Sequence, residues 1–173
     1  MAILKIARMG HPILLARAAA VEDPTDPEIR RLVADMAETM EDAGGIGLAA
    51  PQVHVGLRIF VWRTGAGGAA ALINPVIEPV GEETEAAFEG CLSIPGLRGA
   101  VRRPARIRFR GLDIAGQPVE GEAAGLVARV MQHEADHLDG VLYPMRMEDL
   151  SQFGFTEELA RAAAAERAAK EAP

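Results

Sequence analysis

The sequence predicts an α+β fold in which short, mainly antiparallel β-sheets pack around one buried central helix, with further helices near each end. The central helix is predicted over residues 123–138, because apolar residues occur on nearly every side of that segment. Short runs of β-type residues between positions 57 and 120 are typical of closely spaced antiparallel strands. With 173 residues and no internal repeat or linker, the chain is expected to be a single domain, 1–173.

The flanking helices are indicated by their first residues. The first, over about 27–43, follows a capping Asp26, has proline at its first position and ends at Gly44-Gly45. The second, over about 156–171, has an acidic first turn, and its alanine-rich end has little apolar surface to bury.

Four segments are predicted as strands: residues 57–62, 71–74, 106–110 and a short one near 118–120. A flexible Gly65-Ala66-Gly67-Gly68 loop separates the first two. The third alternates strictly between charged and apolar residues, as a half-buried strand does.

Composition excludes some classes of function. The formal net charge is −7 and lysines and arginines form no cluster, so direct binding of nucleic acid is not expected. Charges interrupt the N-terminal residues before a signal peptide could form, and no stretch approaches the ~20 apolar residues of a membrane span. We expect a monomer that stays in the cytoplasm.

The predicted central helix contains His133-Glu134-Ala135-Asp136-His137. Histidines at positions i and i+4 project from one helix face, so both can bind the same metal ion. Glu134 lies roughly 100° round the helix, where it can hold a proton for water rather than act as a ligand. Burying these polar groups without a metal or a partner would cost several kcal/mol. The sequence therefore predicts a metal site.

A catalytic metal commonly has three protein ligands and one open position, so a third ligand is needed. Cys91, the only cysteine, is one candidate and an acid downstream of the helix is another; spacing alone does not decide between them. A lone cysteine can also be a small buried residue or a reactive thiol. Gln52 follows a glycine-rich run that could be only a turn, but its amide could also donate to a substrate oxygen.

Three segments together resemble the motifs of bacterial peptide deformylases, in the same order along the chain. They are Gly45-Ile46-Gly47-Leu48-Ala49-Ala50-Pro51-Gln52, Glu89-Gly90-Cys91-Leu92-Ser93 and Gln132-His133-Glu134-Ala135-Asp136-His137-Leu138. Supporting similarity extends from Met9 to about Tyr143. The resemblance implies an α+β amide hydrolase that removes the formyl group from the N-terminal formylmethionine of nascent polypeptides.

The resemblance also implies roles for individual residues. Cys91, His133 and His137 would hold one divalent metal ion, Fe²⁺ in the cell for most members, which Zn²⁺, Ni²⁺ or Co²⁺ can replace. Glu134 would be the catalytic acid and base, and Gln52 with the backbone N–H of Leu92 would bind the formyl oxygen. The expected substrate-binding residues are Gly45, Ile46, Gly47, Glu89, Gly90, Arg98, Leu126, Arg129 and Val130.

Several of these substrate contacts have a physical reason as well. The resemblance implies that residues 45–47 lie along the substrate backbone like an added strand. Leu126 and Val130 precede the histidines at helical spacing, so they can form an apolar wall for the methionine side chain. Arg129 adjoins this wall, and its charged end is expected to reach solvent. Arg98 is expected to contact the substrate backbone.

The chain departs from the family pattern at three places. His54 stands where a glycine is common, Tyr143-Pro144-Met145-Arg146 replaces a more usual acidic and basic ending, and the C-terminal helix is acidic rather than strongly basic. The third departure weakens the expectation that this helix docks on the ribosome near its exit tunnel.

The sequence also allows two other functions. A zinc endopeptidase could use the same helix motif with Glu157 or Glu158 as its third ligand. A non-catalytic protein that binds peptide termini or stores metal could also retain the motifs.

Overall fold

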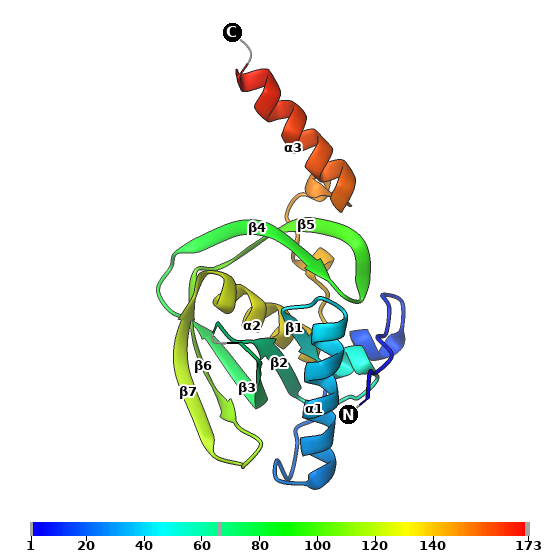
Figure 1. The fold of residues 1–173 in the computed structure, drawn as a ribbon. Helices are drawn as coiled ribbons and strands as arrows, with labels where there is room; N and C mark the ends of the chain where they lie inside the picture. Colours follow the sequence, from blue (N-terminus) through cyan, green and yellow to red (C-terminus); the bar gives the residue numbers. More distant parts are fainter. Residues whose placement is uncertain (1, 66, 172–173) are drawn as a thin grey trace.

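Two antiparallel sheets enclose the central helix in the computed structural model, which describes residues 2–65 and 67–171 (Figure 1). The helices are α1 (Pro27–Asp42), α2 (Gly125–Leu138) and α3 (Thr156–Glu171). The strands are β1 (Gly47–Ala49), β2 (Ile59–Arg63), β3 (Ala69–Pro79), β4 (Thr84–Cys91), β5 (Ile94–Pro104), β6 (Arg106–Leu112), β7 (Pro118–Ala124) and β8 (Phe153–Phe155). The predicted α+β class is confirmed.

The first sheet has the strand order β1-β2-β3-β6-β7 and the second has the order β4-β5-β8, with every pair antiparallel. Both sheets leave an edge strand beside α2: β1 in the first and β4 in the second. The space between these two edges is where the functional residues gather.

Much of the apolar core lies between α1, α2 and the first sheet, and a third cluster includes Ile94 and Val101 of β5. Met36 and Met40 of α1 are fully buried in one apolar cluster with Leu48 and Ile59. Ala128, Met131 and Leu138 of α2 belong to a second cluster with residues of β2, β3 and β6. The expected start of α1 is confirmed, since Asp26 Oδ1 accepts a hydrogen bond from the backbone N–H of Glu28 at 2.8 Å.

The central helix begins two residues later than predicted. Residues 118–124 form β7, which pairs with β6 along its whole length, so Ala123 and Ala124 belong to a strand. The alanines resemble a helix start, but the pairing with β6 overrides that propensity. The expected burial of the helix also fails at its first turn, where Leu126 is 65% exposed. The helix is enclosed only from Ala128 onward.

Strands β1, β4, β5 and β8 were not predicted. β5 contains Pro95, Gly96 and Gly99, and β4 is rich in alanine and glutamate, so neither has the composition of a typical strand. In the predicted 65–68 loop, Ala66 lies outside the described residues. Among the described residues, no helix is both long enough and apolar enough to cross a membrane.

Candidate active site

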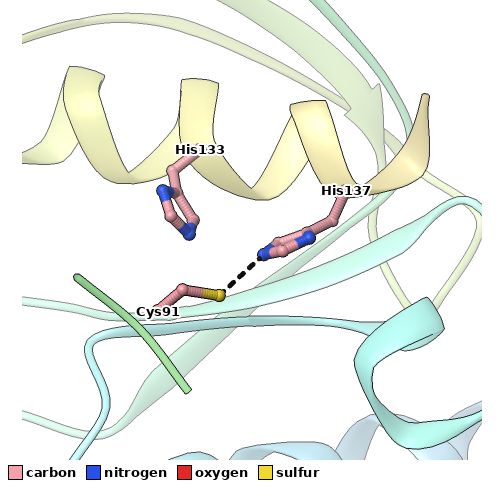
Figure 2. Close-up of side chains that lie close together, drawn as sticks. All are labelled: Cys91, His133 and His137. Carbon is pink, nitrogen blue, oxygen red and sulfur yellow. Dashed lines mark hydrogen bonds between the residues drawn. The ribbon is translucent and has the colours of Figure 1, made fainter. Parts of the chain in front are cut away.

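The two histidines of α2 and the single cysteine converge on one point (Figure 2). Ligand atoms of Cys91, His133 and His137 all lie within 4.8 Å of one another, and Cys91 Sγ is 3.3 Å from His137 Nε2. The imidazole rings are 5.0 Å apart between centroids, as expected for residues one helical turn apart. The structure thus brings together the three predicted ligands.

Cys91 reaches this point because of how β4 ends. The β4–β5 register runs regularly as far as Gly90 opposite Arg98 and then shifts, so that Cys91 pairs with Ile94. Such irregularities re-aim a side chain at the end of a strand and are common beside active sites. The shift lies in the turn that directs the sulfur towards α2.

The chemistry of these three groups fits a divalent transition-metal ion. Burial lowers the pKa of His137 well below its ordinary value, which keeps the imidazole neutral with a lone pair available. Nδ1 of His133 lies 2.8 Å from Glu89 Oε2, so the carboxylate can fix the ring with Nε2 available to a metal. One thiolate and two imidazoles suit both Zn²⁺ and Fe²⁺.

A cavity of about 530 Å³ opens beside the cluster, between α2, the segment leading into β1 and the β4–β5 hairpin. Its lining includes the predicted residues Gly45, Ile46, Gly47, Gln52, Glu89, Gly90, Cys91, Leu92, Arg98, Leu126, Arg129, Val130, His133 and Glu134. Residues that are far apart in the sequence therefore share one cavity beside the point where the three ligand atoms meet. The size of this cavity suits a small peptide.

Glu134 lies under this cavity and is almost completely buried. Its Oε2 has no hydrogen-bond partner among the described residues. Burial raises the pKa of Glu134 to about 7. A carboxyl group with such a pKa can both accept and donate a proton near neutral pH.

Gln52 is oriented by its own backbone neighbourhood. Its Oε1 accepts a hydrogen bond from the backbone N–H of Ala49 at 2.9 Å, which fixes the amide. Its Nε2 is therefore directed towards Cys91 Sγ, at 3.4 Å, and Ser93 Oγ, at 3.1 Å. An N–H donor next to the sulfur can reach an oxygen of a substrate bound at the same place.

The polypeptide deformylase family model matches residues 3–153, most of the chain. Peptide deformylase 1 of Bordetella pertussis is 51% identical over 163 residues, which cover 89% of this chain and 93% of that protein. The crystal structure of peptide deformylase from Thermotoga maritima superposes with a TM-score of 0.82 at 41% identity, covering 86% of this chain and all of that one. The chain belongs to the polypeptide deformylase family.

Members of this family are metal-dependent hydrolases that remove the N-formyl group from nascent polypeptides, so the predicted function is confirmed. A further neighbour is the Met-Ala-Ser-bound crystal structure of a class I type b peptide deformylase from Acinetobacter baumannii. Its TM-score is 0.78 at 33% identity, covering 84% of this chain and 98% of that one.

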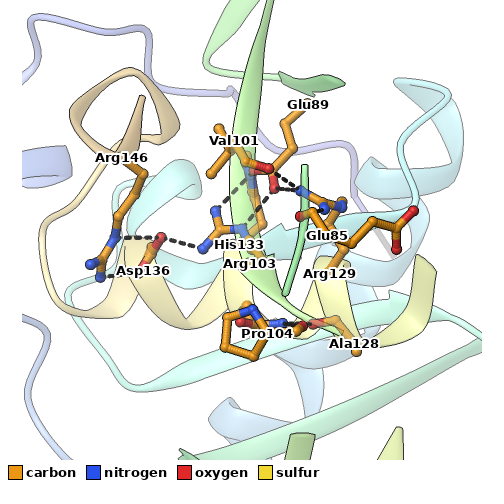
Figure 3. Close-up of polar contacts among 11 residues, drawn as sticks. Glu85, Glu89, Val101, Arg103, Pro104, Ala128, Arg129, His133, Asp136 and Arg146 are labelled. Carbon is orange, nitrogen blue, oxygen red and sulfur yellow. Dashed lines mark hydrogen bonds and ion pairs between the residues drawn. The ribbon is translucent and has the colours of Figure 1, made fainter. Parts of the chain in front are cut away.

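A buried ionic network lies behind the cluster of Cys91, His133 and His137 (Figure 3). Arg103 donates to both carboxylate oxygens of Glu89, at 2.7 and 2.9 Å, and to Asp136 Oδ2 at 2.8 Å. Glu89 in turn contacts His133, while Arg146 binds Asp136 from the outside. Each buried charge therefore has an opposite charge beside it, as burial requires.

Arg129 corrects one of the predictions. Its charged end does not reach solvent: the guanidinium donates to Glu89 Oε1 and to the backbone oxygens of Val101 and Glu85 at 2.7–2.8 Å. Its side chain is only 11% exposed. The fork of a guanidinium suits three acceptors at once, so Arg129 fastens the β4–β5 hairpin to α2.

Sequence reasoning missed Arg103 and gave Asp136 no role. The signal for both was indirect. Glu134 and Asp136 lie in a helix that is otherwise apolar, so a buried cation is needed near them. The sequence does not show which of its arginines supplies this cation. Glu157 and Glu158, the alternative third ligands, are exposed in the first turn of α3 and are not part of the metal cluster.

Proposed function

We propose that Cys91, His133 and His137 hold the catalytic metal of this deformylase, with Glu134 as acid and base and Gln52 and Leu92 as oxyanion donors. The observation that carries the proposal is the convergence of the three ligand atoms within 4.8 Å, at a cavity also lined by Glu134 and Gln52. We further propose that residues 1–173 act as one domain.

When bound, a divalent ion at this cluster supplies a Lewis acid and an activated water to the reaction. Glu134 takes a proton from the attacking water and delivers it to the amine nitrogen as the formyl C–N bond breaks, so formate and a free N-terminus leave. Gln52 Nε2 and the Leu92 N–H donate to the oxyanion at the formyl carbon, where one such donor is worth about 3 kcal/mol.

The substrate is a formyl-Met peptide bound between the two sheet edges. Val130 and Leu126 give the cavity an apolar wall for the methionine side chain, and residues 45–47 offer backbone groups beside it. Arg98 lies across the same cavity and can contact the peptide backbone. The Met-Ala-Ser complex of the Acinetobacter baumannii relative supports this substrate class.

The metal in the cell is proposed to be Fe²⁺. Zn²⁺, Ni²⁺ or Co²⁺ can replace it, because one thiolate and two imidazoles can bind each of these ions. We propose that a monomer acts in the cytoplasm on chains emerging from the ribosome. Metal analysis of protein purified without oxygen identifies the ion, and a protein that carries only zinc while being active would contradict the assignment of iron.

The proton role is tested with Glu134→Ala. The variant is expected to keep its metal and lose most turnover of formyl-Met-Ala-Ser, since a general acid and base contributes about 10²–10⁴-fold. Near-normal turnover with full metal would refute the role.

The ligand set is tested with Cys91→Ser, measured by metal content and by the rate of metal release to a chelator. The variant is expected to bind metal more weakly, because a neutral hydroxyl replaces a thiolate. Glu157→Gln is the matched control, and it separates the deformylase from the endopeptidase hypothesis. If Glu157→Gln lost its metal while Cys91→Ser kept it, the third ligand would be Glu157 and the endopeptidase hypothesis would be favoured.

A further inference from the structure

A second hollow lies on the side of α2 that faces away from the metal cluster. Its volume is about 450 Å³. Ala135 and Asp139, which line it, lie roughly 200–240° round the helix from His133. Its other walls come from β3, the end of β5 and Arg146, and they include the apolar residues Pro75, Val76, Ile77, Pro79 and Pro104.

Arginines dominate the polar lining of this hollow. They are Arg17, Arg58, Arg102, Arg103 and Arg146, five of the 18 lysines and arginines in a chain whose net charge is −7. The acids that line it are Asp136 and Asp139. Two further acids, Glu89 and Glu148, pair with Arg103 and Arg102. Arginines still outnumber acids around the hollow, and this excess of positive charge favours an anionic ligand.

The arginines differ in how far their charge is already satisfied. Arg103 and Arg146 are hydrogen-bonded to Asp136, and Arg58 to Asp139 and the backbone oxygen of Leu138. Arg58 thereby offsets both the acid and the negative C-terminal end of α2, which would otherwise repel an anion.

Arg17 and Arg102 are held only loosely. Their closest carboxylate oxygens are 3.6 Å away on Asp139 and 3.5 Å away on Glu148, beyond a strong charged hydrogen bond. The Arg17 side chain is 81% exposed and that of Arg102 is 49% exposed, and ion pairs at such exposed positions contribute little to stability. Their guanidinium groups can therefore turn to a ligand at small cost.

We propose that this hollow binds a small, doubly charged oxyanion of the inorganic phosphate type. Guanidinium groups bind the oxygens of tetrahedral anions with paired hydrogen bonds, and five arginines line this hollow. The proline-rich wall keeps water from one side, which strengthens the attraction. This site is separate from the deformylase cavity and does not depend on the metal.

The test is calorimetric titration of inorganic phosphate into the Ni²⁺-loaded protein at constant ionic strength, with chloride as the comparison anion. The wild type is expected to bind with a dissociation constant near or below ~1 mM. Arg17→Gln/Arg102→Gln should weaken binding at least about tenfold. The matched control, Arg106→Gln/Arg108→Gln, removes two exposed arginines of β6 and should bind like the wild type.

The outcomes separate the possibilities. If both double variants bind phosphate as tightly as the wild type, phosphate binds elsewhere, including at the metal. If both bind it more weakly to the same degree, the effect is one of general charge. Either result overturns the proposal, as does absence of binding by the wild type. Deformylase turnover and metal content should be unchanged in both variants, because none of the four arginines belongs to the proposed active site. Failure of this inference is therefore distinct from failure of the proposed function.

Discussion

Gly47 passes directly over the carboxylate of Glu134. A Cβ at residue 47 would lie 2.8 Å from Glu134 Cδ and 2.9 Å from Val130 Cγ1, closer than real Cβ atoms approach. The glycine therefore lets the β1 edge and α2 lie close enough to share one cavity. Its place in the glycine-rich motif is explained by this contact rather than by an unusual backbone conformation.

Gly47→Ala tests this relationship. The new methyl group must displace the Glu134 carboxylate, so kcat/KM for formyl-Met-Ala-Ser is expected to fall at least about tenfold, or ~1.4 kcal/mol, with metal content unchanged. Gly56→Ala is the matched control, because no atom lies within 4 Å of its Cβ position. Activity of Gly47→Ala within twofold of the control would contradict the proposed position of Glu134.

The stability of the metal-free protein is expected to fall in acid because of Glu89. Burial alone would raise the pKa of Glu89, but hydrogen bonds from Arg103 and His133 outweigh burial and lower it from 4.5 to about 2. Because the pKa is lower in the folded state, Glu89 contributes stability above pH 4.5 and loses it as the pH falls towards about 2.

The measurement is urea unfolding of the metal-free wild type and of Glu89→Gln. The difference in unfolding free energy between the two is expected to shrink by about 2 kcal/mol between about pH 6 and about pH 3. The comparison cancels the titration of groups whose pKa does not depend on Glu89. A difference that stays constant over this range would show that Glu89 is not held as a buried carboxylate.

The face of α2 that carries His133 and His137 could be predicted because it depends only on local geometry. Two histidines one turn apart share a helix face in any protein, and Glu134 then follows from the same periodicity. Cys91 could not be placed in this way. Its position depends on the β4–β5 hairpin and its register shift, and these strands contain the prolines, glycines and charges that hide a strand from pattern analysis.

The same limit applies to the arginines that lie behind the site, Arg129 and Arg103. The exposed end expected for Arg129 was inferred from the general behaviour of arginines on helices, but three acceptors from β4 and β5 bind it instead. Arg103 was missed because its partners are 14 and 33 residues away in the sequence. Pairings of this kind arise from tertiary packing, which no local pattern encodes.

Arg129→Lys is expected to destabilise the protein. A lysine cannot reach Glu89, Val101 and Glu85 together, so at least one buried acceptor loses its partner and the unfolding free energy should fall by about 2 kcal/mol or more. Arg110→Lys is the control, since its guanidinium is exposed and 3.7 Å from Glu78. Chemical denaturation of the metal-loaded proteins measures both, and equal stability of the two variants would mean that Arg129 does not fasten the hairpin.

The C-terminal segment divides into a part that supports the site and a part that does not. Strand β8 pairs with β5 through Phe155, Gly154 and Phe153, opposite Leu97, Arg98 and Gly99, and Leu97 and Arg98 line the active-site cavity. Beyond it, α3 extends away from the sheets in Figure 1, and within its described side chains only Leu159 is partly buried.

Two truncations distinguish these parts. Deleting residues 161–173 should leave both the thermal midpoint and kcat/KM unchanged, because the side chains that the structure describes in this segment are all exposed and the pair of Arg161 with Glu158 lies at the surface. Deleting residues 153–173 also removes β8, so the midpoint should fall by several degrees and KM for formyl-Met-Ala-Ser should rise as the strand carrying Arg98 loses its neighbour. If the shorter deletion had the same effect as the longer one, α3 rather than β8 would support the cavity wall.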